Sequence, residues 1–232
     1  MNAKFSGHYI TISLGITNCF LIACHNGYLL VDTSLEKYYD RFRKELTDHA
    51  VELKQIRYIF LTHHHTDHTG FLASLLRDTG AVLIVHKNAL PFVARGINND
   101  NMVGTTALIR FFMLIKKLFR MERTNEAVVP DEKAVIIESD NNEILRSFGI
   151  PAGIKLLPGH TADSIAIIDD DGNAFIGDAA VNILGVIGLK NRPLVSENPG
   201  AVFECWKKIR DENGKQLFVS HGKPLHINEL LH

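Results

Sequence analysis

The chain has 232 residues, of which 46% are hydrophobic and 22% are charged, and these are the proportions of a globular protein that buries a sizeable core. Its formal net charge of −1 gives no overall field that would attract nucleic acid, so we expect no nucleic-acid partner. The three cysteines, Cys19, Cys24 and Cys205, do not form a disulfide framework, and we expect buried thiols. No signal-peptide layout and no apolar run of membrane-spanning length is present, which predicts a cytoplasmic protein.

Strands and helices alternate in the first part of the chain. Short apolar runs separated by turn residues predict strands over 9–12, 19–23 and 28–31. Asp32-Thr33-Ser34 ends the third strand and is expected to cap a helix over 35–49. The pattern then predicts a strand over 55–61, a helix from Gly70, a strand over 81–85 and a short helix over 88–95.

Residues 96–130 interrupt this alternation and form a helical insertion. Residues 105–121 carry apolar side chains at helical spacing on one side and basic side chains on the other. The pattern favours a helix packed on the domain with a solvated cationic face. The helix over 104–121 is alternatively a lid over a site, a homodimer contact or an interfacial helix on anionic lipid. As a lid, it would place Phe111, Phe112 and Met113 against an apolar substrate.

The second half returns to strands. Apolar runs predict strands over 133–137, 154–157, 164–168, 174–176 and 216–219, and a helix over 199–213 precedes the last of them. Each half therefore contains strands followed by a helix and a further strand. This order favours two sheets packed together with helices outside.

A histidine-rich stretch, Thr62-His63-His64-His65-Thr66-Asp67-His68, follows the strand over 55–61. Side chains at i and i+2 of an extended segment share a face, so His63 and His65 can aim at one point while His64 points away. Thr66-Asp67 resembles a helix N-cap, which would place Asp67 and His68 at the strand-to-helix corner. Two pairs of ligands at one corner suit two adjacent metal ions, and imidazole with carboxylate favours zinc, or iron or manganese.

Three further candidate ligands stand at similar corners. His160, Asp178 and His221 each lie one to three residues beyond an apolar strand, beside a glycine that allows close backbone approach. Neighbouring strand ends in a sheet would bring these side chains to one edge. Taken singly, each is more often an ordinary loop residue.

The H-x-H-x-D-H run, the later Gly-His and Gly-Asp pairs and the late His-Gly pair resemble the metallo-β-lactamase-fold hydrolase superfamily. The resemblance spans about Asp32 to Gly222 and leaves the insertion uncovered. It implies an α/β protein, a four-layer αββα sandwich formed by one domain over 1–232, with a dinuclear site at an edge of the sheets. By this resemblance the first metal would be held by His63, His65 and His160, the second by Asp67, His68 and His221, and Asp178 would bridge both. Asp32 would orient ligands from behind.

The residue types also suit a hydrolytic reaction. A water on such metals has its pKa lowered towards roughly 7, which supplies a hydroxide nucleophile near neutral pH. Asp67 is also a candidate catalytic residue that orients this nucleophile or passes a proton to the leaving group. A small-molecule ester, thioester or lactone is the first choice of substrate, and a phosphodiester is the alternative. An iron-dependent oxidoreductase of the superfamily is a third possibility, and a non-catalytic binding role a fourth.

Differences between this sequence and particular branches of the superfamily narrow the choice of substrate class. The dinuclear β-lactamases generally lack the bridging aspartate, so Asp178 counts against antibiotic hydrolysis. Glyoxalase II enzymes add a carboxy-terminal domain, which the short stretch after His221 does not resemble. The tRNA-processing nucleases add a basic arm, and neither such an arm nor a strong positive charge is evident in this sequence. The generic branch with lactonase-like and thioesterase-like enzymes remains. His226 is a further candidate proton donor, although an ordinary surface histidine is the favoured interpretation.

Overall fold

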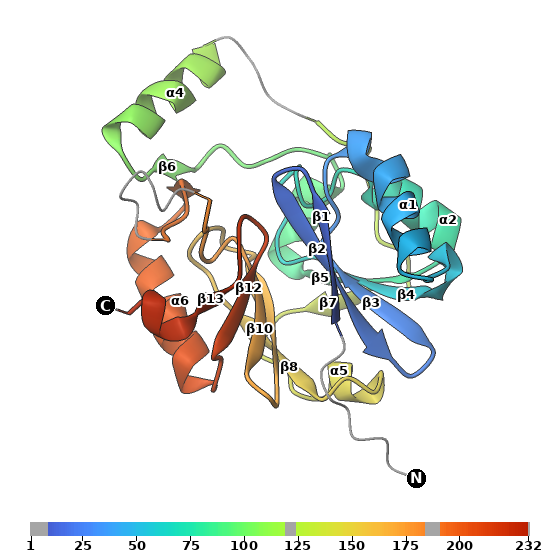
Figure 1. Cartoon of the computed structure of the whole chain (residues 1–232). Coiled ribbons are helices and arrows are strands. Elements are labelled where there is room, and N and C mark those ends of the chain that lie inside the picture. The colour runs from blue at the N-terminus through green and yellow to red at the C-terminus, as the bar shows by residue number, and fades with distance from the viewer. Residues whose placement is uncertain (1–8, 119–123, 184–190, 232) are drawn as a thin grey trace.

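Two β-sheets face each other in the computed structural model, which describes residues 9–118, 124–183 and 191–231 (Figure 1). The first sheet has the order β1-β2-β3-β4-β5-β7, formed by β1 (Tyr9–Leu14), β2 (Thr17–Cys24), β3 (Gly27–Val31), β4 (Ile56–Phe60), β5 (Val82–His86) and β7 (Val135–Ile137). The second has the order β13-β12-β10-β9-β8, formed by β8 (Ala152–Leu156), β9 (Ile165–Asp169), β10 (Asn173–Gly177), β12 (Gln216–Val219) and β13 (Leu225–His226). A separate ribbon pairs β6 (Val103–Gly104) with β11 (Val195–Ser196).

Parallel pairing decides where the strand ends lie. β3, β4, β5 and β7 run parallel to one another, and β10 runs parallel to β12 in the other sheet. The carboxyl ends of parallel neighbours lie at the same edge of a sheet, where ligands of α/β proteins commonly bind. The residues that follow these strands are therefore brought together although they are far apart in sequence.

An apolar layer fills the space between the two sheets. Side chains alternate along each strand, so Phe20 and Ile22 of β2 point into this layer while Cys19 and Leu21 point to the outer face. Phe175 and Phe218 contribute from the second sheet, with their rings stacked at a centroid distance of 4.9 Å. Both faces of the first sheet are thus buried, which explains why its strands are apolar runs without polar alternation.

Helices cover the two outer faces, as Figure 1 shows. α1 (Tyr39–Asp48), α2 (Leu72–Thr79) and α3 (Leu90–Val93) contribute Phe42, Leu75 and Val93 to the core outside the first sheet. α6 (Pro199–Asp211) covers the second sheet with Trp206 and Ile209. The short α5 (Ile144–Ser147) lies beside β8. The predicted α/β architecture, a four-layer αββα sandwich, is confirmed.

Two predicted helix caps are wrong. The helix predicted over 35–49 begins with the 3-10 turn Glu36–Tyr38, and its N-cap residue, Leu35, has no capping side chain. Thr33 is used elsewhere, since its hydroxyl donates to the His68 carbonyl oxygen. The next helix, α2, begins at Leu72 rather than Gly70, because residues 66–71 form turns. These turns carry Asp67 and His68, so the residues that resemble helix caps in both places position the candidate site instead.

The insertion is only partly helical. α4 (Ala107–Leu118) occupies most of the helix predicted over 105–121, and residues 119–121 lie outside the described ranges. Phe111 is 58% exposed, which does not fit an enclosed substrate pocket, and the side chain of Phe112 is not described. The two-residue strands β6, β11 and β13 were not predicted because such short segments carry no periodicity. None of the described helices combines the length and apolarity needed to cross a bilayer.

Candidate metal centre

Five strand ends deliver the candidate ligands to one edge of the sandwich. Asp32 follows β3, the histidine-rich stretch follows β4, and β8, β10 and β12 are followed by His160, Asp178 and His221. Backbone bonds join the two sheets there: Ile165 N donates to Thr62 O at 2.8 Å, and Asn18 N donates to Ser220 O at 2.8 Å. The edge is consequently a fixed platform formed by both sheets.

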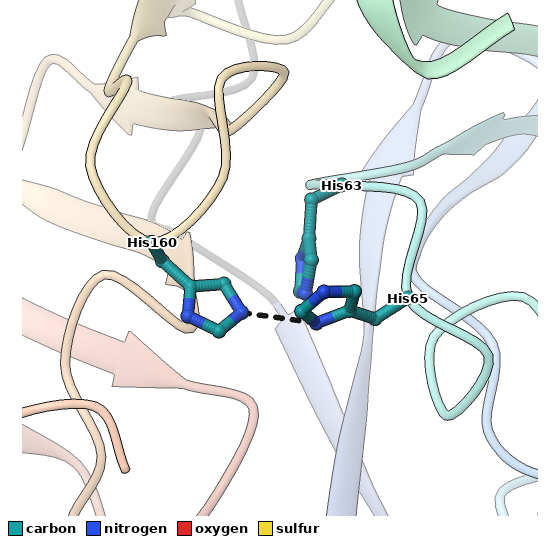
Figure 2. Close-up of side chains that lie close together, drawn as sticks. All are labelled: His63, His65 and His160. Atoms are coloured by element: carbon teal, nitrogen blue, oxygen red, sulfur yellow. Dashed lines mark hydrogen bonds between the residues drawn. The ribbon is translucent and has the colours of Figure 1, made fainter. Parts of the chain in front are cut away.

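His63, His65 and His160 form the first group (Figure 2). Each is buried, and one nitrogen from each lies within 4.8 Å of the others. His160 Nε2 lies 3.1 Å from His65 Nδ1. Two imidazoles bound tetrahedrally to zinc at about 2.0–2.1 Å have their nitrogens about 3.4 Å apart. The separation therefore fits the edge of a metal coordination shell.

Asp67, His68 and His221 form the second group. His221 Nε2 lies 3.3 Å from Asp67 Oδ2, and His68 Nε2 lies 3.9 Å from Asp67 Oδ1. Asp178 stands between the groups, with its carboxylate oxygens 3.4 Å from His221 Nε2, 3.6 Å from His68 Nε2 and 3.7 Å from His160 Nε2. The structure thus brings together all seven predicted ligands, and Asp178 occupies the position expected of a shared carboxylate.

Hydrogen bonds on Nδ1 turn the opposite nitrogen of several histidines inward. His160 Nδ1 donates to Val195 O at 2.8 Å, and His221 Nδ1 donates to Ile16 O at 2.7 Å. His68 Nδ1 donates to Asp32 Oδ2 at 2.9 Å. An acceptor on one ring nitrogen fixes the tautomer, leaving the lone pair of Nε2 directed at the centre. Metal-binding histidines are oriented in this way.

Asp32 organises two ligands from behind the site. Besides accepting from His68, its carboxylate accepts from Thr62 N at 2.8 Å and from Thr62 Oγ1 at 2.7 Å. The Thr62 hydroxyl in turn lies 3.0 Å from His63 Nδ1, so His63 is oriented through Thr62. Asp32 is fully buried and adopts a left-handed backbone with φ 57°. These contacts agree with the orienting role that the sequence resemblance implies.

Several side-chain atoms of the ligand residues are buried without a hydrogen-bond partner among the described residues: His63 Nε2, His68 Nε2, Asp178 Oδ1 and also His65 Nε2, although it is Nδ1 of His65 that faces His160. An unsatisfied buried polar atom costs about 1–3 kcal/mol, so folded proteins leave few of them. Here they cluster among residues whose donor types suit divalent zinc. The donor set therefore fits a metal centre.

The protonation pattern of the metal-free chain separates the two groups. Burial lowers the pKa of His63, His65 and His160, which keeps their imidazoles neutral. Burial also acts to lower the pKa of His221, but Asp178 and then Asp67 outweigh it and raise that pKa to about 10. The second group thus balances carboxylates with protonated imidazoles, and cations would replace those protons.

His64 points away from the ligand groups, as predicted, and makes its own contacts with Asp163, Asn99 and Phe92. Its Nδ1 lies 2.8 Å from Asp163 Oδ1, its Nε2 accepts from Asn99 N at 3.2 Å, and its ring stacks on Phe92 at 4.2 Å. His64 and Asp163 are both buried. This pair fixes the backbone between His63 and His65. His226, by contrast, is exposed and caps the 3-10 turn Ile227–Glu229, so it is a surface histidine.

Asparagines from the insertion hold the histidine-rich loop in place. Asn98 Oδ1 accepts from Thr66 N at 2.8 Å, and Asn125 Nδ2 donates to Thr66 O at 2.8 Å and to Thr69 Oγ1 at 2.9 Å. The ends of the insertion therefore support the site. Sequence reasoning missed these asparagines, because a loop asparagine carries no signal of its distant partner.

The backbone around Asp178 is fixed from two sides. Trp206 Nε1 donates to Ala179 O at 2.7 Å, so α6 holds the residue after Asp178. Gly177 has φ 56°, and a Cβ there would lie 2.5 Å from Thr62 Oγ1. Glycine is needed both for the left-handed turn and for this close approach.

Comparisons with known proteins agree with this geometry. The family model of the metallo-beta-lactamase superfamily matches residues 12–186. Solved structures with the same fold include an archaeal metallo-beta-lactamase superfamily protein from Sulfolobus tokodaii, with 19% identity over 96% of this chain and 83% of that chain and a TM-score of 0.63. A metallo-beta-lactamase family protein from Thermus thermophilus has 19% identity over 97% and 75%, with a TM-score of 0.65. A class B3 di-zinc metallo-beta-lactamase from an Alaskan soil metagenome has 15% identity over 94% and 77%, with a TM-score of 0.65.

The chain belongs to the metallo-beta-lactamase superfamily. The superfamily resemblance noted in the sequence is confirmed, together with the fold that it implies. Members of this superfamily are mostly metal-dependent hydrolases, and the histidine and aspartate groups of this chain can hold metal ions. At these identities the solved structures establish the fold, and the substrate is a separate question.

Proposed function

We propose that the chain is a metal-dependent hydrolase that binds two divalent ions, zinc in the first instance, and cleaves a small ester, thioester or lactone. His63, His65 and His160 would hold one ion, Asp67, His68 and His221 the other, and Asp178 would contact both. The observation that carries the proposal is the convergence of the seven side chains into neighbouring groups, in each of which the candidate ligand atoms lie within 4.8 Å of one another. Bound divalent ions lower the pKa of water and polarise the oxygen of a substrate.

Asp67 is the residue to which we assign a catalytic role, that of orienting the attacking water. Its side chain is 27% exposed, whereas the other six candidate ligands are buried, so we assign Asp67 to the side from which a substrate arrives. Burial acts to raise the pKa of Asp67, but the charges of His68 and His221 outweigh it, so the carboxylate is ionised in the metal-free chain. An ionised carboxylate at this position is suited to accept a hydrogen bond from the attacking water and to orient it.

Other residues around the site fix the orientation of the candidate ligands by hydrogen bonds. Asp32 fixes His68 directly and His63 through Thr62, and the carbonyls of Val195 and Ile16 fix His160 and His221. Prepositioned groups do not have to reorganise during the reaction, which is where much of the rate enhancement of enzymes originates.

Phosphodiester hydrolysis is the second candidate. Asp178 lies within 3.4–3.7 Å of nitrogens from both ligand groups, and a shared carboxylate between two ions suits in-line displacement at phosphorus as well as acyl transfer. Antibiotic hydrolysis is not favoured, since the superfamily resemblance associates the dinuclear β-lactamases with the absence of this aspartate.

The test is a substrate panel on protein purified without chelator and reloaded with zinc. Esters, thioesters, lactones, phosphodiesters and a β-lactam should be compared for the wild type, Asp67→Asn and His226→Ala. We expect turnover of an acyl substrate that is lost on chelation, falls at least tenfold in Asp67→Asn and is unchanged in His226→Ala. Turnover confined to phosphodiesters would favour the second candidate. Equal activity in the chelated and loaded protein would reject both.

A further inference from the structure

One side of α4 exposes large apolar side chains. Leu108, Phe111 and Leu114 are 62%, 58% and 63% exposed. Their spacing of three residues places them along one side of the helix. A single exposed leucine needs no explanation, but a row of three large apolar residues on two turns of helix makes this side of α4 a candidate binding surface.

α4 is anchored at its base and projects from the sandwich. Figure 1 shows it beside β6, outside the two layers of sheet. Thr105 Oγ1 donates to Leu194 O at 2.9 Å, and Arg110 Nε donates to Gly104 O at 2.9 Å. Val103 and Leu194, which flank this base, are also partly exposed apolar residues. The helix is thus held by the β6–β11 ribbon with its apolar row turned to solvent.

The same segment is strongly basic. Residues 104–124 contain a single acidic residue, Glu122, against the basic residues Arg110, Lys116, Lys117, Arg120 and Arg123. The chain as a whole has a formal net charge of −1, so the positive charge is concentrated in the segment that exposes the apolar row. A helix with leucine and phenylalanine on one side and an excess of lysine and arginine is the pattern of a helix that lies in the interface of an anionic membrane.

A second copy of the chain fits this surface less well. Symmetric pairing through α4 would bring two basic segments together, which is unfavourable. A helix of 12 residues is about 18 Å long and offers a face of roughly 180 Å², whereas stable protein interfaces bury about 800 Å² on each partner. A lipid surface needs no such area, because apolar insertion and charge attraction act together.

We propose that α4 docks on an anionic lipid surface, with Leu108, Phe111 and Leu114 inserted at the headgroup boundary and with the net positive charge of the sequence around them attracting the anionic lipids. The docking is peripheral and reversible. The docking does not depend on the metal centre, so a failure of the proposed hydrolase activity would not refute the lipid docking, and the reverse also holds.

The test is sedimentation of the full chain with vesicles of phosphatidylcholine alone or mixed in equal parts with phosphatidylglycerol. The variant L108Q/F111Q/L114Q removes the apolar row, and K116Q/K117Q removes charge. Val129→Gln is the matched control, since Val129 is 80% exposed and lies outside α4. We expect binding to the anionic vesicles only, a fall of at least tenfold in the partition coefficient for each multiple variant, no change for Val129→Gln, and weaker binding at high salt.

Other results would overturn the proposal. Absence of binding to the mixed vesicles would do so, and so would binding that the triple variant leaves unchanged. A dimer in solution that L108Q/F111Q/L114Q converts to monomer, without lipid binding, would identify a second copy as the occupant. Melting temperatures of the variants, which replace side chains that are largely exposed or basic, should match the wild type and thus exclude misfolding.

Discussion

Removing the carboxylate of Asp163 should weaken both the fold and the metal centre. In Asp163→Ala, the Nδ1–H of His64 loses its 2.8 Å partner in a place where both side chains are buried. A buried donor without an acceptor costs about 1–3 kcal/mol, and we expect a loss near 2 kcal/mol. For a chain of this size that corresponds to about 4–8 °C in melting temperature. His64 lies between two ligands, so we also expect metal affinity to fall about tenfold.

The assay combines urea denaturation of the metal-free chain with competition against a chromophoric chelator. Asp163→Asn is the conservative variant: its amide oxygen still accepts from His64, so stability and affinity should largely return. Asp170→Ala is the matched control, because it breaks the exposed pair between Arg146 and Asp170, which is worth about 0–1 kcal/mol. If Asp163→Ala is as stable as Asp170→Ala and binds metal like the wild type, the positioning role of the pair is refuted.

The same edge of the sandwich supports two further predictions. Trp206→Phe leaves the buried Ala179 carbonyl without its donor, so we expect a loss of about 1–3 kcal/mol in urea denaturation, whereas the exposed Lys207→Gln on the same helix should show none. In the metal-free chain, the pKa of His221 is raised from 6.5 to about 10, so the folded state keeps a proton that the unfolded chain loses. This contribution to the free energy of unfolding is complete below pH 6.5 and is lost as pH rises towards 10. Urea denaturation of the metal-free chain at pH 7 and 9.5 should therefore show a lower free energy of unfolding at the higher pH. A metal-free His221→Gln chain that loses the same amount of stability between these pH values would contradict the prediction.

The layering and the convergence of the candidate ligands at one edge were predictable because each rests on local patterns. Apolar runs such as 19–23 and 28–31 specify strands buried on both faces, and the corner residues after them specify what is presented at the edge. The spacing of His63 and His65 then predicts a shared target, which their geometry bears out.

The residues that hold the ligands were less accessible to sequence reasoning. Asp163 is 99 positions from its partner His64, and Trp206 reaches Ala179 from a different layer. No local pattern connects such pairs. The wrong helix caps have the same origin: Thr33 is a good capping residue by type, but its hydroxyl bonds to the His68 carbonyl across the site. The cytoplasmic location and the single-domain organisation over 1–232 stay predictions.

The central claim is that residues remote in sequence form one paired-metal centre, and metal counting tests it most directly. Protein prepared without chelator and loaded with zinc should contain two ions per chain by mass spectrometry of the metals. His221→Ala should retain one ion, and the exposed His226→Ala should retain both. If the wild type binds no zinc, or if His221→Ala still binds two ions with unchanged affinity, the centre described above is not what these residues form.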